Sequence, residues 1–325
     1  MEQNLALQIK NLSVDYQVYE GVLKVIPGLD LKVKEGERVG LIGETGCGKT
    51  TVLKAVAAIL QSPPAIINKE VIAVGGKAVD RKKGIKNTRK KVSMIFQDPA
   101  TSLNPTLKIS TLMIDILKSS FPALKKEEYQ QMMINSLKAV SMPAPERVLD
   151  SYPVELSGGM KQRVCIAMAL MKDADLILAD EPTTALDVTI EEQILDLLND
   201  LVREKKKSLL IVSHALGALR KMTDRIYVMY AGNVVETAST QTIFSEAKHP
   251  YTIGLLAATP KLTGEGLADG IAGDIPSYIN PPQGCRFASR CSRTTELCLE
   301  KTPPLTSVDQ NKSWQVACYH MQKTE

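Results

Sequence analysis

A glycine-rich stretch, GETGCGKTT at residues 43–51, carries the clearest chemical signal in the sequence. Glycines let backbone N–H groups close around a phosphate, and a following helix adds positive potential at its N-terminus. The Lys49 ammonium can then reach the terminal phosphates of a nucleotide, and the Thr50 hydroxyl is a ligand for Mg²⁺. The stretch matches the P-loop pattern and predicts a phosphate site formed by Gly43, Glu44, Thr45, Gly46, Cys47, Gly48, Lys49, Thr50 and Thr51.

Two carboxylates follow a second apolar run, LILADEP. Leu176 to Ala179 predict a strand that is buried on both faces, and open parallel sheets bind ligands at the C-terminal ends of such strands. Asp180 is placed to hold Mg²⁺ through its water shell. Glu181 is placed to orient and polarise an attacking water, a role for a carboxylate within hydrogen-bond reach. Together with the P-loop, this pair predicts nucleoside triphosphate hydrolysis.

A third stretch, VELSGGMKQRVCIAMAL, places Ser157, Gly158 and Gly159 before a long apolar-rich helix. The N-terminus of that helix is a second place where a phosphate can bind. Because the chain already has a phosphate site for its own nucleotide, two interpretations remain. The three residues form an ordinary helix cap, or they serve a nucleotide that is held by a second molecule.

These side chains require an α/β fold with a parallel sheet. Val39 to Ile42 predict a short buried strand before the P-loop, and the helix after the loop has apolar residues at helical spacing. The apolar face of this predicted helix consists of Val52, Leu53, Val56, Ala57 and Leu60.

The composition indicates a soluble globular protein of 325 residues, with 44% hydrophobic and 23% charged residues, long enough for two domains. The net charge of +4 is too small to indicate nucleic-acid binding. The basic stretches RKKGIKNTRKK and REKKKS are predicted to be solvated loops, with contact to an acidic membrane surface or partner as the alternative. We expect neither a signal peptide nor a membrane span, and therefore a cytosolic chain with reduced thiols.

Four cysteines gather in the last 41 residues, after a segment rich in Gly and Pro that is predicted to be linker and turns. Cys285, Cys291, Cys298 and Cys318 are separated by five, six and nineteen residues. The segment is too short for a sizeable core of its own and needs a cross-link to stabilise its fold. Four thiolates bound to Zn²⁺ or to an iron–sulfur cluster would provide one. The first two gaps are wider than those of zinc knuckles, which favours a cluster over zinc; thiols without metal are a third possibility.

Taken together, the motifs resemble those of the ATP-binding cassette (ABC) ATPases, because LSGGMKQR is similar to the family signature and the other motifs follow in order. The resemblance covers residues 1 to about 250 and implies ATP and Mg²⁺ as ligands. It implies that Tyr16 stacks on adenine, that Gln97 contacts the γ-phosphate and Mg²⁺, and that Asp187 and His214 are the D-loop aspartate and switch histidine. In this family two cassettes close head to tail, and each signature completes the site of the other.

Several stretches, including MIFQDPATSLNP, DEPTTALDVTI and HPYTIGLL, resemble one branch, the oligopeptide and dipeptide importer ATPases, which also includes nickel importers. The implied fold is a P-loop NTPase (RecA-like) core over residues 1–250 with an inserted helical subdomain at about 98–165, followed by a small Cys-rich extension over 251–325. The implied partners are a second, related ATPase subunit, two transmembrane permease subunits and, indirectly, an extracytoplasmic substrate-binding protein. The chain would lie peripherally on the cytoplasmic face of the membrane.

The alternative class is a soluble ABC ATPase that acts on nucleic acid or ribosomes. Such proteins generally carry a long coiled-coil insert or two cassettes. Here 108 positions separate Lys49 from Ser157, and the chain has one P-loop. We therefore expect no nucleic-acid partner. The transported substrate is not encoded in an ATPase chain.

Three positions depart from the family pattern. Ala215 follows His214 where Asp is usual, so we expect a less firmly held switch loop. Cys47 stands where Ser is common, and with Cys165 it is predicted to be a packing or loop cysteine.

The importer ATPases carry a similar tail pattern, GCxFxxRC…C…VAC, and some bind a [4Fe–4S] cluster with it, which implies the same here with zinc as the alternative. Trp314 stands where His is frequent, and His320 is predicted to be an exposed tail residue rather than a ligand.

Overall fold

The computed structural model describes residues 4–79, 91–184, 186–258 and 270–322, so most of the first basic stretch lies outside the described residues. The chain divides into two compact units. We call one the helical unit, which comprises Met1–Leu7, Val33–Glu37 and Val74–Ser213. The other is the P-loop unit, which comprises Gln8–Lys32, Arg38–Ala73 and His214–Glu325.

Three parallel strands form the sheet of the helical unit: β7 (Val92–Ile95), β8 (Leu176–Asp180) and β9 (Ser208–Val212). Every residue of β8 and β9 is buried, as expected for central strands of a parallel sheet. The prediction of a strand buried on both faces at 176–179 is confirmed. The REKKKS stretch covers the last two residues of the preceding helix, α8 (Val188–Glu204), the turn at 205–207 and the first residue of β9.

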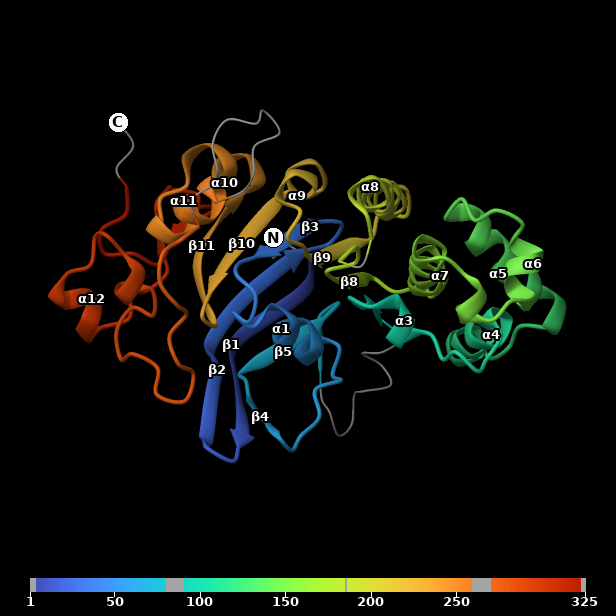
Figure 1. Cartoon of the computed structure of the whole chain (residues 1–325), viewed down its shortest axis with the longest axis horizontal. Coiled ribbons are helices and arrows are strands. Elements are labelled where there is room, and N and C mark those ends of the chain that lie inside the picture. Colours follow the sequence, from blue (N-terminus) through green and yellow to red (C-terminus); the bar gives the residue numbers. More distant parts are fainter. Residues whose placement is uncertain (1–3, 80–90, 185, 259–269, 323–325) are drawn as a thin grey trace. The chain divides into compact units, whose positions relative to one another are not determined.

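Helices fill the segment between β7 and β8, all of which is described, and Figure 1 shows them in green as one group. Buried apolar residues at helical spacing, such as Met113 and Leu117 or Met133 and Leu137, direct these helices against one another. The elements are α3 (Pro99–Ser102), α4 (Ile109–Ser120), α5 (Lys126–Ala139), α6 (Pro145–Asp150), the 3₁₀ turn η1 (Pro153–Glu155) and α7 (Gly158–Met171).

A mixed sheet lies at the centre of the P-loop unit. Strand β3 (Arg38–Ile42) pairs in parallel with β10 (Arg225–Tyr230), which pairs antiparallel with β11 (Asn233–Ser239). Two short strands of the C-terminal extension, residues 251–325, which we call the tail, continue it. β13 (Gln315–Val316) pairs with β11, and β12 (Thr306–Ser307) pairs with β13. The tail thus adds strands to the sheet that contains β3, the strand directly before the P-loop.

A second, antiparallel layer contains the long strands β1 (Leu5–Val18) and β2 (Gly21–Lys34), drawn in blue in Figure 1. Alternating buried residues face its core, for example Leu29, Leu31 and Val33 on β2. The shorter strands are β4 (Ala65–Asn68), β5 (Val71–Val74) and β6 (Lys77–Ala78).

The helices of the P-loop unit are short: α1 (Lys49–Val56), α9 (Leu216–Met222), α10 (Thr240–Glu246), α11 (Pro250–Ala257), η2 (Ala288–Arg290) and α12 (Glu296–Glu300). The apolar face that the sequence predicts for α1 is longer than the helix itself. α1 ends at Val56, and Ala58 has a positive φ of 56°, so Leu60 is buried beyond the helix end. None of the helices among the described residues is long and apolar enough to cross a membrane.

Candidate functional site

The P-loop connects β3 to α1 and depends on two glycines. Gly43 has φ 150°, and a Cβ there would lie 2.1 Å from the carbonyl oxygen of Met229. Gly48 has φ 105°, and a Cβ there would lie 2.6 Å from Ile26. A Cβ at Gly43 would collide with the backbone, and both φ values are ones that residues with a side chain rarely adopt, so this loop path requires glycine.

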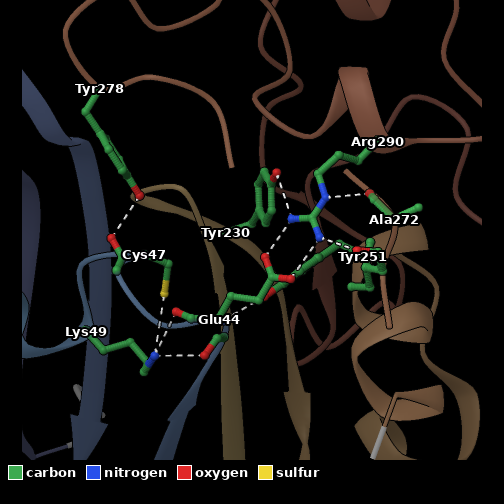
Figure 2. Close-up of polar contacts among 11 residues, drawn as sticks. Glu44, Cys47, Lys49, Tyr230, Tyr251, Ala272, Tyr278 and Arg290 are labelled. Atoms are coloured by element: carbon green, nitrogen blue, oxygen red, sulfur yellow. Dashed lines mark hydrogen bonds and ion pairs between the residues drawn. The ribbon is translucent and has the colours of Figure 1, made fainter. Parts of the chain in front are cut away.

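The Lys49 side chain folds back onto the P-loop. Its Nζ donates hydrogen bonds to the carbonyl oxygens of Gly43 at 2.8 Å and Glu44 at 3.0 Å (Figure 2). The side chain is buried by the loop, which keeps the ammonium beside the backbone that would surround a phosphate. Cys47 is fully buried next to it, and burial raises the pKa of its thiol. Cys165 is buried as well, and burial raises the pKa of that thiol to about 12, so both cysteines lie where a packing role requires.

Tyr16 lies on β1, and its hydroxyl is 3.5 Å from the Thr51 hydroxyl in the first turn of α1. The ring is partly exposed. The predicted adenine-stacking residue is therefore next to the P-loop helix.

Gln97 and Glu181 are brought together in the helical unit. The Gln97 side-chain amide donates to a Glu181 carboxylate oxygen at 3.0 Å, and the Thr184 hydroxyl donates to the same oxygen at 3.0 Å. Glu181 has φ 44°, an uncommon conformation for a residue with a side chain, and its N–H is bonded to the carbonyl of Val212 on β9 at 2.9 Å. Thr184 was not predicted as a site residue, although it lies within the DEPTTALD motif.

Buried Asp180 ends β8, directly before Glu181. Two further predicted residues of this unit are helix caps: Ser157 Oγ accepts from the Met160 N–H at 3.3 Å, and Asp187 accepts from the Ile190 N–H at 3.0 Å. Ser157 and Gly158 are exposed, so the N-terminus of α7 is accessible. The helix-cap interpretation of Ser157 is confirmed, and it does not conflict with phosphate binding.

His214 precedes α9, and Ala215 is the N-cap residue of that helix. Alanine has no side-chain acceptor for the first N–H groups of a helix, whereas aspartate at this position would have one. The structure gives a physical reason for the expectation that the loop after His214 is less firmly held.

All four tail cysteines line one small cavity, together with His249, Phe287 and His320. Cys291 and Cys318 each accept a backbone N–H from the residue two positions further on, at 3.4 and 3.3 Å. Burial raises the pKa of Cys285 to about 11, and a hydrogen bond from the Phe287 backbone partly offsets this. Yet no group of three or more His, Cys, Asp or Glu side chains within the described ranges is placed so that it could hold a metal ion. The four-cysteine metal or cluster site stays a prediction.

Two family profiles match the chain. The profile described as "ABC transporter" covers residues 26–184, and "Oligopeptide/dipeptide transporter, C-terminal region" covers residues 235–298. Over 316 residues the chain is 39% identical to the oligopeptide transport ATP-binding protein OppD of Bacillus subtilis, covering 95% of this chain and 88% of that protein. The chain belongs to the ABC transporter ATPases.

Two further known proteins are similar to this ABC ATPase. It is 36% identical over 334 residues to the oligopeptide transport ATP-binding protein OppF of Haemophilus influenzae, which covers 97% of both chains. Among solved structures, a dimeric ATP-binding cassette in a post-hydrolysis state bound to ADP and Pi is 28% identical, with a TM-score of 0.64 over 72% of this chain and 98% of that one. The predicted mixed α/β fold, family and ATPase activity are confirmed.

Proposed function

We propose that this ABC ATPase is the nucleotide-binding subunit that energises an importer for dipeptides and oligopeptides. The observation that carries the proposal is the similarity over 95% of the chain to a protein named for oligopeptide transport. A second family profile supports it, because residues 235–298 match the C-terminal region of oligopeptide and dipeptide transporters. The motifs shared with all ABC ATPases end before most of this region.

The proposed organisation follows the family. An ABC ATPase domain over residues 1–250, with its helical subdomain at about 98–165, is followed by the Cys-rich extension over 251–325. The chain would bind two transmembrane permease subunits from the cytoplasmic face of the membrane and pair with a second, related ATPase subunit. The substrate-binding protein would act on it through the permease.

ATP would be held by the P-loop through its backbone N–H groups and Lys49, with Tyr16 against the adenine. Thr50, Gln97 and Asp180 would supply oxygen ligands for Mg²⁺, which would neutralise charge on the phosphates. Lys49 is already held at the loop by two carbonyl oxygens, so little ordering of its side chain remains for ligand binding.

Glu181 would accept a hydrogen bond from the attacking water and polarise it. Gln97 and Thr184 fix one carboxylate oxygen of Glu181, which orients the carboxylate. Gln97 would thereby link the state of the nucleotide to the permease, since it bonds directly to the proposed base. The accessible N-terminus of α7, with Ser157, Gly158 and Gly159, would complete the nucleotide site of the second ATPase subunit, and Asp187 and His214 would act at the interface and at the γ-phosphate.

For the tail we propose a [4Fe–4S] cluster held by the four cysteines, with zinc as the alternative. Support comes from the shared cavity and from the backbone N–H groups directed at three of the sulfurs, an arrangement that stabilises thiolates. Iron, zinc and acid-labile sulfide on anaerobically purified protein test this. About four iron and four sulfide per chain are expected for a cubane cluster; one zinc without sulfide would replace the cluster by a structural zinc site, and no metal would refute both.

The ATPase mechanism is tested with Glu181→Gln, which keeps the size of the side chain and removes its charge. We expect ATP to bind normally and turnover to fall by about 10² to 10⁴-fold, the usual contribution of a positioned base. Glu204→Gln, at the exposed end of α8, is the matched control and should hydrolyse ATP at the normal rate. Normal turnover by Glu181→Gln would show that Glu181 is not the base.

A further inference from the structure

The tail of this protein contacts the P-loop at three separate points, all within the P-loop unit (Figure 2). The Tyr251 hydroxyl accepts the backbone N–H of Glu44 at 2.8 Å. The Tyr278 hydroxyl donates to the carbonyl oxygen of Gly46 at 3.0 Å. Arg290 makes a two-pronged ion pair with the Glu44 carboxylate, with N–O distances of 2.7 and 2.9 Å. Sequence motifs had indicated no such contact.

Arg290 is held more completely than a surface arginine. Its five N–H groups all have acceptors: two go to Glu44, and the others go to the Tyr230 hydroxyl and the carbonyl oxygens of Ile271 and Ala272. Its side chain is only 4% exposed, and that of Glu44 is 26% exposed. A shielded, two-pronged pair of this kind is stronger and more exact in geometry than a solvated salt bridge.

The side chains behind these contacts are closely packed. The rings of Tyr230, Tyr251 and Phe287 pack on one another, with centroids 4.6 to 5.4 Å apart. Nearby, Arg286 donates to the carbonyl oxygens of Lys24 and Ala231, which fastens the tail to β2 and to the end of β10. Arg290 therefore reaches the P-loop from a packed layer rather than from a free loop.

We propose that Arg290 is a positioning residue for ATP binding: with Tyr278 and Tyr251, it holds Glu44 and Gly46 so that the P-loop keeps the shape that receives phosphate. The inference rests on the proposed role of the P-loop in holding ATP. It also gives the tail a function within the same chain.

The shape of the P-loop decides how well it holds phosphate. Backbone N–H groups of the loop bind phosphate only when they converge, so a small change of the loop path costs affinity even when every residue is present. Glu44 is the first residue after the glycine that leaves β3, and Gly46 is two residues further on. Fixing these two residues restrains the first half of the loop.

The test measures the Kd of ATP and ADP for the purified full chain and for Arg290→Met and Arg290→Lys. We expect Arg290→Met to raise both Kd values about tenfold, within the usual range of coupling between sites. Arg290→Lys should lie between it and the wild type, because lysine keeps the charge without the two-pronged geometry. Lys301→Met, at an exposed lysine of the same tail, is the control and should bind like the wild type.

Two readouts separate positioning from a purely structural effect. In a Glu44→Gln background the Arg290→Met change should have little further effect on the Kd, because the partner charge is already gone. Emission of Trp314, the only tryptophan of the chain, reports tail docking and should be unchanged in Arg290→Lys. If Arg290→Met fails to fold, Tyr278→Phe removes only the hydroxyl at Gly46 and should raise the Kd about threefold, as expected for one lost hydrogen bond.

Kd values within twofold of the wild type in Arg290→Met, or in Tyr278→Phe where Arg290→Met does not fold, would overturn the inference. Full additivity with Glu44→Gln would also overturn it. Wild-type protein that binds no ATP would instead overturn the proposed function itself, so the two failures are distinguishable.

Discussion

Acid should release the tail of this protein through a single buried histidine, His249. The residue is the N-cap of α11, its Nδ1 accepts the Tyr251 N–H at 3.0 Å, and its side chain is buried. Nδ1 can accept this bond only while it is unprotonated. Burial lowers the pKa of His249 from 6.5 to about 4, and a hydrogen bond with the Ala317 backbone partly offsets the shift.

The direction of the pH effect on stability follows from the difference between the His249 pKa in the folded and in the unfolded protein. The pKa of His249 is lower in the folded protein than in the unfolded chain, so its contribution to stability is present above pH 6.5 and is lost as the pH falls towards 4. At about 1.4 kcal/mol per pKa unit, the full contribution is about 3 kcal/mol. About 2 kcal/mol of it disappears between pH 7 and pH 5.

The assay is denaturant unfolding between pH 7 and pH 5, followed by Trp314 emission. Trp314 Nε1 donates to buried Glu236 at 3.0 Å, and Glu236 also accepts the backbone N–H groups of Lys248 and His249, so the signal reports the region around His249. His249→Asn keeps an N-cap acceptor but cannot titrate. We expect its unfolding free energy to fall by about 2 kcal/mol less than that of the wild type over this pH range.

The wild type and His249→Asn share every other ionisable group, so the difference between them isolates the contribution of His249. His320→Asn, at an exposed histidine of the same tail, is the control and should follow the wild type. The same pH dependence in wild type and His249→Asn would refute the assignment.

Two further predictions concern the ATPase motifs. Ala215→Asp should stabilise the protein by about 1 kcal/mol, because it adds an acceptor at the N-cap of α9, and thermal unfolding checks this; no gain would mean that the α9 N-terminus is already satisfied. Gly158→Glu should abolish ATP hydrolysis by the assembled pair of ATPase subunits while the isolated chain keeps its Kd for ATP, since the N-terminus of α7 would serve the nucleotide of the other subunit. Weaker binding in the isolated chain would place α7 in the chain's own site.

The motifs of the nucleotide site could be predicted from sequence because each is local. Glycine spacing specifies the P-loop, and an uninterrupted apolar run specifies β8, which is buried along its whole length. Apolar periodicity was a weaker guide to where α1 ends, since Leu60 is buried without being helical. Burial alone does not distinguish a residue inside the helix from a buried residue that follows it.

The tail could not be predicted in the same way, because its contacts join distant parts of the chain. β13 has two residues and no periodic pattern, yet it pairs with β11 about 80 positions earlier. Arg290 and Glu44 are 246 positions apart, and neither shows its partner in sequence. The HPYTIGLL stretch marked a family branch, but only the structure shows that its tyrosine, Tyr251, bonds to the P-loop.

The most direct test of the central claim is ATP-dependent uptake of a labelled oligopeptide into proteoliposomes that contain the complex purified through this chain. We predict that permease subunits and a second ATPase subunit accompany the chain, that uptake requires ATP, and that Glu181→Gln abolishes uptake while Glu204→Gln supports it normally. Peptide uptake that persists with Glu181→Gln, or a complex that contains nucleic acid or ribosomes in place of permease subunits, would contradict the account.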